Sequence, residues 1–568
     1  MTECTTPSVL LSMRALIFLL CGNPNIWYNE PRLANNWRTA NWINRRIYKS
    51  VMLHPLNSKQ FRKILCGGLF TLVPLLSAIL FCFRDGKLIS DIYIPLGGWS
   101  DEITYYKQIE GILAYGMPRG YFGYNQSRAL YGSLGVWGLL PLIPYVIFGF
   151  FFGWNYCSPV YANILFSMLA FLVIYIFLRP DKKSLGVISI FWITNQFLNR
   201  YVLSGVVESS VILQLVVITS CAEYLLSDKV RTQAGRTFTP RKDSAVLVLC
   251  TFLICLLTLA RPYYGVLFLI PLWKAVKDKN RKLIFSLPFL AVAIIGLFFI
   301  NNHYFCSVYF NNIFAFDKMR SAGLSGMLLS LFDSIIEILR LIWYALRYKG
   351  SGVGWYYLLL GLELFGMTVI CILRKIRRQA VPPIYIITLI GNSLILISII
   401  EMYQLGVGAR HILALLTVNA VVLILESHFF WGILFAAICL FSIWQTQGAD
   451  GLPYAEESYS SYMDSLEEAF SKIIQISDDI SYDNVVAMPT ADSKAASPDE
   501  NVSTYYGLLF AVPAGAGVSL DYQDFYDDPD NIKAKYILVH PEGSIRFTLE
   551  NMGMTCVYED STAMLYSR

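Results

Sequence analysis

Runs of about 20 apolar residues recur along the chain up to residue 446, and each is long enough to cross the hydrocarbon core of a bilayer. Because no water is available there, each run must satisfy its own backbone, which favours a helix. The composition agrees: 55% of the 568 residues are hydrophobic and only 15% are charged, too few to cover a soluble surface. The chain is therefore predicted to be an all-α polytopic membrane protein with about eleven transmembrane helices.

Charge is distributed unevenly along the sequence. Residues 447–568 contain 6 Lys and Arg against 21 Asp and Glu, whereas the rest of the chain contains 39 against 19. A basic membrane part followed by an acidic tail indicates two compartments rather than a nucleic-acid partner. We expect a basic cytoplasmic segment at 1–63, a transmembrane catalytic domain at 64–446 and an acidic extracytoplasmic domain at 447–568.

Lys and Arg gather in the short loops between spans, and the positive-inside rule places those loops in the cytoplasm. This rule puts two long loops, 84–133 and 301–352, on the outer face, with a helix at 327–344 expected in the second. The expected spans are 64–83, 159–178, 185–199, 206–226, 245–260, 263–273, 283–300, 353–373, 384–400, 412–425 and 429–444.

The tail has the pattern of a small α/β domain. Residues 459–476 have helical spacing, and the apolar run at 535–540 is typical of a buried strand. Further strands are expected at 484–488, 555–558 and 563–566, with a short helix at 546–552. This mixture predicts a packed domain rather than a disordered tail.

Two acids begin a helix in the first outer loop. Ser100 can cap it, and Asp101 and Glu102 then occupy its first turn, about 100° apart, so that one could act on a substrate while the other is held structurally. Tyr105 and Gln108 share the face of Asp101. The alternative is an ordinary helix start, where acidic residues are common.

Single ionisable residues also lie at the outer ends of several spans. Arginine there opposes the topogenic charge bias, and its planar fork suits a phosphate. The alternative is snorkelling to lipid headgroups. Neither metal-ligand spacing nor a Gly-rich phosphate loop is present. The candidate substrate-binding residues are Arg200, Glu208, Arg261, Glu401, Arg410 and His411.

The order of these motifs resembles the GT-C membrane glycosyltransferases, particularly the protein O-mannosyltransferase and lipid A aminoarabinose transferase branch. The resemblance covers most of 60–446. It begins with SDEITYY and YGSLGVWGLLPLIPY in the first loop and continues with RYVLSGVVE, Arg261-Pro262 and GARHILAL. Three features depart from the family pattern and bear on donor binding: His411 replaces an aromatic residue, Glu208 replaces a commoner Asp, and a proline expected a few residues after His411 is missing.

The resemblance implies an inverting glycosyltransferase that moves a hexosyl or pentosyl group from a polyprenyl-phosphate donor to an acceptor hydroxyl at the outer face. Asp101 or Glu102 would be the catalytic base. Tyr105, Arg200, Glu208, Arg261, Arg410 and His411 would bind donor or substrate. No metal site is implied, although a role for Mg²⁺ or Mn²⁺ stays open.

The partners implied are the donor lipid, an envelope glycan, lipid or protein acceptor, and the bilayer of a cell membrane, bacterial in origin. Two alternatives stay open: a polyprenyl-lipid-linked polysaccharide polymerase or ligase, and a lipid-linked sugar flippase. A flippase predicts internal repeats and ionisable residues near mid-membrane.

The charge distribution predicts that the N-terminus is inside and the C-terminus outside. A reporter enzyme that is active only after export, fused behind Arg568, is expected to be active. Activity of a cytoplasm-only reporter at the same position would contradict this topology and would place the candidate site on the wrong face.

Overall fold

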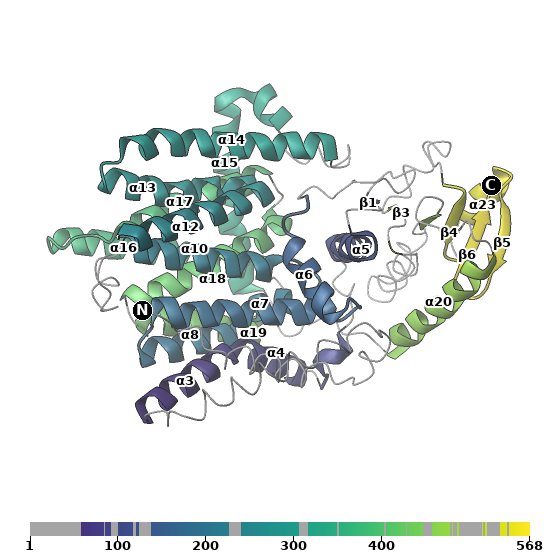
Figure 1. Cartoon of the computed structure of the whole chain (residues 1–568), viewed down its shortest axis with the longest axis horizontal. Coiled ribbons are helices and arrows are strands. Elements are labelled where there is room, and N and C mark those ends of the chain that lie inside the picture. Colours follow the sequence, from purple (N-terminus) through teal and green to yellow (C-terminus); the bar gives the residue numbers. More distant parts are fainter. Residues whose placement is uncertain are drawn as a thin grey trace. The chain divides into compact units, whose positions relative to one another are not determined.

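Figure 1 shows the computed structural model of the chain. The structure describes residues 58–84, 86–92, 100–116, 121–123, 138–226, 240–305, 316–348, 352–402, 405–427, 429–446, 457–476, 480, 485–487, 514, 517–519, 534–541 and 545–568. It separates into two compact units, residues 1–68 and 69–568. Of the first unit only 58–68 are described, and they form the first part of helix α3 (Ser58–Thr71).

A helix lies over each of the expected spans. Four of the expected spans are each covered by two consecutive helices: α3 and α4 (Val73–Arg84), α7 (Ser158–Val173) and η4 (Ile174–Leu178), α8 (Lys182–Thr194) and α9 (Gln196–Val202), and η5 (Pro262–Phe268) and α13 (Leu269–Lys277). The other expected spans are covered by one helix each: α10 (Glu208–Leu226), α12 (Pro240–Ala260), α14 (Arg281–Phe305), α16 (Val353–Ile376), α17 (Pro383–Met402), α18 (Leu405–Ser427) and α19 (Phe429–Thr446).

Length and composition confirm the polytopic fold class. Among the described residues, 6 helices are long and apolar enough to cross a membrane, or 7 if α3 and α4 form one broken span. The remaining predicted spans are shorter apolar helices or helices broken in the middle. These include the apolar stretches Arg410–Leu425 and Phe430–Gln445.

The span of α8 and α9 is interrupted at Asn195, and asparagine side chains take up the freed backbone groups. Asn195 accepts from the Leu198 N–H at 3.1 Å, and the Asn199 amide donates to the Trp192 and Asn195 carbonyls. Ser77 of α4 donates to the Asn199 amide oxygen at 2.7 Å. A broken helix can persist at membrane depth only if its polar groups are satisfied in this way.

Helix α10 is the central helix of the bundle. It contacts α7, α12 and α18, and Figure 1 shows it beside the first two. Within its span 78% of the residues are buried, whereas only 11% are buried in α14, which therefore presents most of its surface to lipid. The N-terminus of α10, at Glu208, is consequently enclosed by neighbouring helices.

The loop segments after α4 and α14 also contain helices. The first holds η3 (Ile89–Asp91), α5 (Ser100–Tyr115) and the short apolar helix α6 (Ile143–Phe152). The second holds α15 (Phe316–Arg347), which includes the helix expected at 327–344. Tyr105 of α5 and Tyr145 of α6 belong to one buried cluster with Phe166 and Val207, so α5 is packed against the bundle rather than free in the loop.

The tail is an α/β domain, as predicted. Its helices are α20 (Glu457–Ile476) and α23 (Ile545–Asn551), and its strands are β2 (Val485–Ala487), β3 (Gly517–Ser519), β4 (Tyr536–Val539), β5 (Thr555–Glu559) and β6 (Met564–Ser567). Helix α23 packs Ile545 and Leu549 against Ile537, Val539 and Tyr566 of the sheet. Gly553, at φ +80°, ends this helix, the conformation that glycine adopts without strain.

A strand from the first loop completes this sheet. The strand order is β1-β3-β2-β4-β6-β5, and β1 (Tyr121–Gly123) pairs in parallel with β3 through Tyr121 and Gly517. The Tyr115 hydroxyl at the end of α5 also donates to the Ala514 carbonyl at 2.8 Å. The sequence did not predict β1 or β3. Paired strands must lie on the same side of a membrane, so the first loop and the tail share one compartment.

Candidate active site

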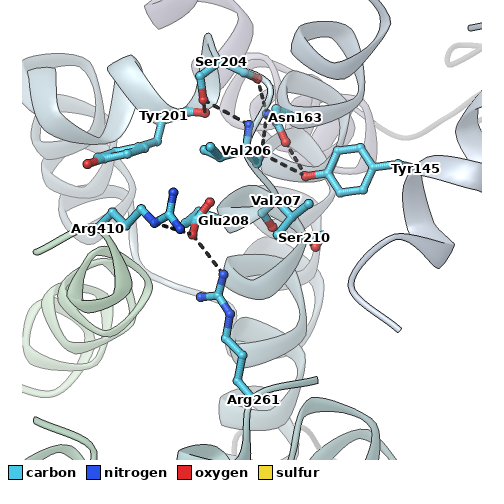
Figure 2. A network of polar contacts seen from close by, with 10 residues as sticks. All are labelled: Tyr145, Asn163, Tyr201, Ser204, Val206, Val207, Glu208, Ser210, Arg261 and Arg410. Atoms are coloured by element: carbon cyan, nitrogen blue, oxygen red, sulfur yellow. Dashed lines mark hydrogen bonds and ion pairs between the residues drawn. The ribbon is translucent and has the colours of Figure 1, made fainter. Parts of the chain in front are cut away.

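An ion-pair cluster lies at the N-terminus of α10. The Glu208 carboxylate is 1% exposed, and its Oε1 lies 2.9 Å from an Nη atom of the fully buried Arg261, the N-cap residue of η5. The Nε atom of Arg410, in the second turn of α18, lies 4.0 Å from the same oxygen. Figure 2 shows the two guanidinium groups approaching Glu208 from different helices. Three of the six predicted ionisable residues are thus brought together.

The ion pairs of this cluster among the described residues join two guanidinium groups to one carboxylate. The second oxygen, Glu208 Oε2, is buried and has no hydrogen-bond partner among those residues. An unsatisfied buried acceptor costs about 1–3 kcal/mol, so a ligand or water donor at this oxygen would be favourable. An anionic ligand at this place would have the guanidinium groups of Arg261 and Arg410 as partners of opposite charge.

His411 and several tyrosines surround the arginines. His411 is fully buried, and it lies close enough to Arg261 and Arg410 for their positive charges to act on its imidazole ring. Tyr263 and Tyr264, directly after Arg261 in the chain, are buried, with ring centroids 4.7 Å apart. Phenol groups can hydrogen-bond a phosphate or a sugar without adding charge. His411, which the sequence analysis named as a single residue at a span end, therefore lies beside Arg261 and Arg410.

Arg200 lies beside the cluster rather than in its ion pairs. It is half-buried in the last turn of α9. The neighbouring Tyr201 lies within range of the charges of Arg410, Arg200 and Glu208, and its ring packs against Tyr356. Arg200 is thus placed to add a further cation to the side of the cluster formed by α9 and α18. The side chain of Glu401 is outside the described residues.

Of the two acids in the first turn of α5, Glu102 is held by the bundle. It is fully buried, and its Oε1 accepts from the backbone N–H of Gly205 at 2.7 Å. Gly205 lies three residues before Glu208, so α5 is attached to the chain that leads into the ion-pair cluster. The side chain of Asp101 is outside the described residues, although its backbone is in the first turn of α5.

Tyr105 lies one turn after Asp101, between α5 and the cluster. It is 4% exposed and within range of the charge of Arg261. Tyr106 faces another way: its ring stacks on Trp154, with 5.5 Å between centroids, and its carbonyl accepts from the Trp154 indole. These contacts fix the rotation of α5 about its axis, with Tyr105 toward the cluster.

A polar network that the sequence analysis missed supports the chain before Glu208. The Asn163 amide of α7 donates to the Ser204 carbonyl at 2.8 Å and to the Val206 carbonyl at 3.0 Å, and its oxygen accepts from the Tyr145 hydroxyl (Figure 2). The signal that could have revealed it is an asparagine inside the apolar run of α7, because polar residues in spans are expensive.

Among the residues that the structure describes, no group of three or more His, Cys, Asp or Glu side chains is placed to hold a metal ion. The carboxylates of the site, Glu102 and Glu208, are engaged with Gly205 and Arg261.

The sequence matches no family model and no curated protein. Among solved structures, the fold is similar to ArnT from Cupriavidus metallidurans bound to undecaprenyl phosphate, at TM-score 0.47 and 10% identity, over 88% of this chain and 97% of that one. It is also similar to the archaeal oligosaccharyltransferase AglB from Archaeoglobus fulgidus in complex with an inhibitory peptide and a dolichol-phosphate, at TM-score 0.45 and 13% identity, over 85% and 70%. Both belong to the GT-C superfamily. At these scores the likenesses assign no residue role and no substrate to this chain.

The buried ion pair predicts a large loss of stability when one partner is removed. Arg261→Met leaves Glu208 buried with only the distant Arg410, so we expect the free energy of unfolding to fall by about 3–5 kcal/mol. The double variant Glu208→Leu with Arg261→Met removes both charges and is expected to recover more than half of that loss. Denaturant unfolding in detergent measures both.

The exposed pair of Arg340 and Glu337 on α15 is the matched control. Its atoms are 3.3 Å apart and its side chains are 67% and 48% exposed. Arg340→Met is therefore expected to change stability by less than about 1 kcal/mol. Equal effects of Arg261→Met and Arg340→Met would show that burial of the Glu208 pair contributes nothing.

Proposed function

We propose that this chain is a membrane glycosyltransferase that moves a sugar from a polyprenyl-phosphate donor to an acceptor hydroxyl at the outer face of the membrane, with inversion. The observation that carries the proposal is the cluster of Arg261 and Arg410 around the carboxylate of Glu208. It supplies buried positive charge at one end of the bundle, beside the acidic first turn of α5. The order of motifs along the sequence, which resembles GT-C transferases, supports the same reading.

In this proposal the arginines bind the phosphate of the donor. Arg410 is 8% exposed and Arg261 is fully buried, so Arg410 makes the first contact and Arg261 strengthens the positive field behind it. Fixed cations in a water-poor site stabilise charge far more than they would in water, and this is commonly the largest catalytic term. Tyr201 and His411 lie near Arg410, Tyr105 lies near Arg261, and Arg200 lies beside Tyr201.

The base of the proposed reaction is Asp101. The acceptor oxygen attacks the anomeric carbon, its proton passes to Asp101, and the bond between that carbon and the phosphate oxygen breaks. The leaving phosphate takes the electron pair and is held by the arginines. Glu102, held by the Gly205 N–H, anchors the helix that presents Asp101. A base of this kind contributes about 10²–10⁴-fold to the rate.

One observation favours the flippase alternative. Glu363, in the middle of α16, is 1% exposed, and mid-membrane acids are what a transporter predicts. Its neighbour is Asn419 of α18, which accepts a hydrogen bond from Asn392 of α17. If the chain moves lipid-linked sugar rather than transferring it, Glu363→Gln should abolish translocation of the donor lipid across proteoliposome bilayers.

The proposal is tested by sugar transfer from a labelled polyprenyl-phosphate donor, with variants matched for expression and detergent stability. Asp101→Asn removes the basic oxygen, so transfer is expected to fall by about two to four orders of magnitude. Glu102→Gln keeps an oxygen that can accept from Gly205 and should be milder. In the same assay Arg410→Lys keeps the charge but loses the planar fork, so transfer should also fall.

Arg377, an exposed cation that follows α16 at the other end of the bundle, is the control. Arg377→Ala is expected to leave transfer unchanged. Activity of both acid variants equal to wild type would show that the pair is only a helix start and would remove the proposed catalytic centre. A dead Glu102→Gln beside an active Asp101→Asn would exchange the two roles.

A further inference from the structure

The segment that joins α9 to α10, residues 203–207, touches both halves of the proposed active site. Its Gly205 N–H donates to the buried Glu102 of α5. Three residues later the chain reaches Glu208, whose carboxylate binds Arg261. The segment is neither helix nor strand over most of its length, so its shape has to be set by contacts with other elements.

Asn163 supplies those contacts. Its side chain is fully buried in α7, 41 residues from Ser204 and 43 from Val206 in sequence, and its amide group bonds both of their carbonyls. The amide has two N–H groups and one oxygen, and all three are used, because the oxygen accepts from the Tyr145 hydroxyl. Ser204 adds a local bond from its hydroxyl to the Tyr201 carbonyl at 2.8 Å.

The geometry of this bond set is specific to an amide. The carbonyls of Ser204 and Val206, on either side of Gly205, both accept from the Asn163 side chain (Figure 2). This arrangement turns the Gly205 N–H toward Glu102. A carboxylate at 163 would repel both carbonyls, and an aliphatic side chain would leave them unsatisfied. The Tyr145 hydroxyl donates to the amide oxygen of Asn163. The amide nitrogen of Asn163 is therefore the atom that faces residues 204–206.

We infer that Asn163 is a positioning residue of the proposed transferase: by holding residues 204–206 it presents the Gly205 N–H to Glu102 and so fixes the helix that carries Asp101 relative to the Glu208–Arg261 pair. The inference rests on the proposed function, because it assigns a role within that site. Asn163 acts through Gly205 and Glu102 and does not touch substrate. Displacing a base by about 1 Å can lower turnover about 10²-fold.

A double-mutant cycle tests the path from Asn163 to Glu102. Asn163→Ala is expected to lower kcat for sugar transfer at least about tenfold with a smaller change in the KM for the donor, because positioning rather than binding is lost. In a Glu102→Ala background the same change should lower kcat less than about threefold, since coupled residues are non-additive. Asn163→Asp keeps the volume and the acceptor for Tyr145 but should be as damaging as Asn163→Ala.

Asn392 provides the matched control. It is a buried asparagine in another span, α17, and it donates to Asn419. Asn392→Ala is expected to lower the melting temperature in detergent but to act additively with Glu102→Ala on kcat. Additive behaviour of Asn163→Ala, or the same coupling for Asn392→Ala, would overturn the inference.

Hydrogen–deuterium exchange of the full-length protein supplies a readout that does not depend on activity. Asn163→Ala should speed exchange both at 203–207 and in peptides from the first two turns of α5. Faster exchange at 203–207 alone would reduce Asn163 to a local structural role and overturn the inference. If the wild-type protein transfers no sugar, the proposed function fails, and the exchange result still decides whether Asn163 fixes α5.

Discussion

A carboxylate that stays ionised among membrane helices needs cations beside it, because an unpaired buried ion costs several kcal/mol. Glu208 is such a group, and the arginines that neutralise it come from elements far apart in sequence, the turn after α12 and the start of α18. This requirement draws the ends of α10, α12 and α18 to one place. The first loop is then joined to that place by the bond between Glu102 and Gly205. The arrangement of these helix ends therefore follows from the free energy that burying the Glu208 carboxylate would cost without the two arginines.

The membrane-spanning part of the fold could be predicted from sequence because it depends on a local quantity. The length of an apolar run decides whether it can span. A helix lies over every run that was named, and among the described residues 6 of these helices, or 7 if α3 and α4 form one span, are long and apolar enough to cross. Glu208, Arg261, Arg410 and His411 could also be named, because single ionisable residues at the ends of spans invite a functional explanation and arginine at the outer ends opposes the usual charge bias. Their mutual contacts could not, since helix packing is decided by side chains distant in sequence.

The elements that the sequence did not reveal depend on non-local contacts. Strands β1 and β3 have 3 residues each, and they pair across almost 400 positions, so their partners cannot be read from the neighbouring sequence. In the sequence Asn163 is one polar residue in an apolar span. The carbonyls to which it donates lie about 40 residues away in the chain, so its role could not be read locally. Which of the two acids Asp101 and Glu102 is held structurally likewise depends on the contact with Gly205. No spacing rule in the sequence connects Gly205 to Glu102.

The shared sheet of the first loop and the tail has a topological consequence. Because β1 pairs with β3, an even number of spans must separate α5 from the tail, as the expected topology has it. The acidic tail and the acidic first turn of α5 therefore face one compartment. The Tyr115 hydroxyl, at the end of α5, adds a second connection to the tail through Ala514.

Binding of a lipid phosphate at the arginine cluster around Glu208, as proposed, is tested most directly by an electron cryo-microscopy structure of the protein with a bound polyprenyl phosphate. A phosphate oxygen is expected within about 3 Å of the Arg410 guanidinium, with Arg261 behind it still paired to Glu208. A lipid phosphate bound at any other place, with the cluster unchanged, would contradict the account.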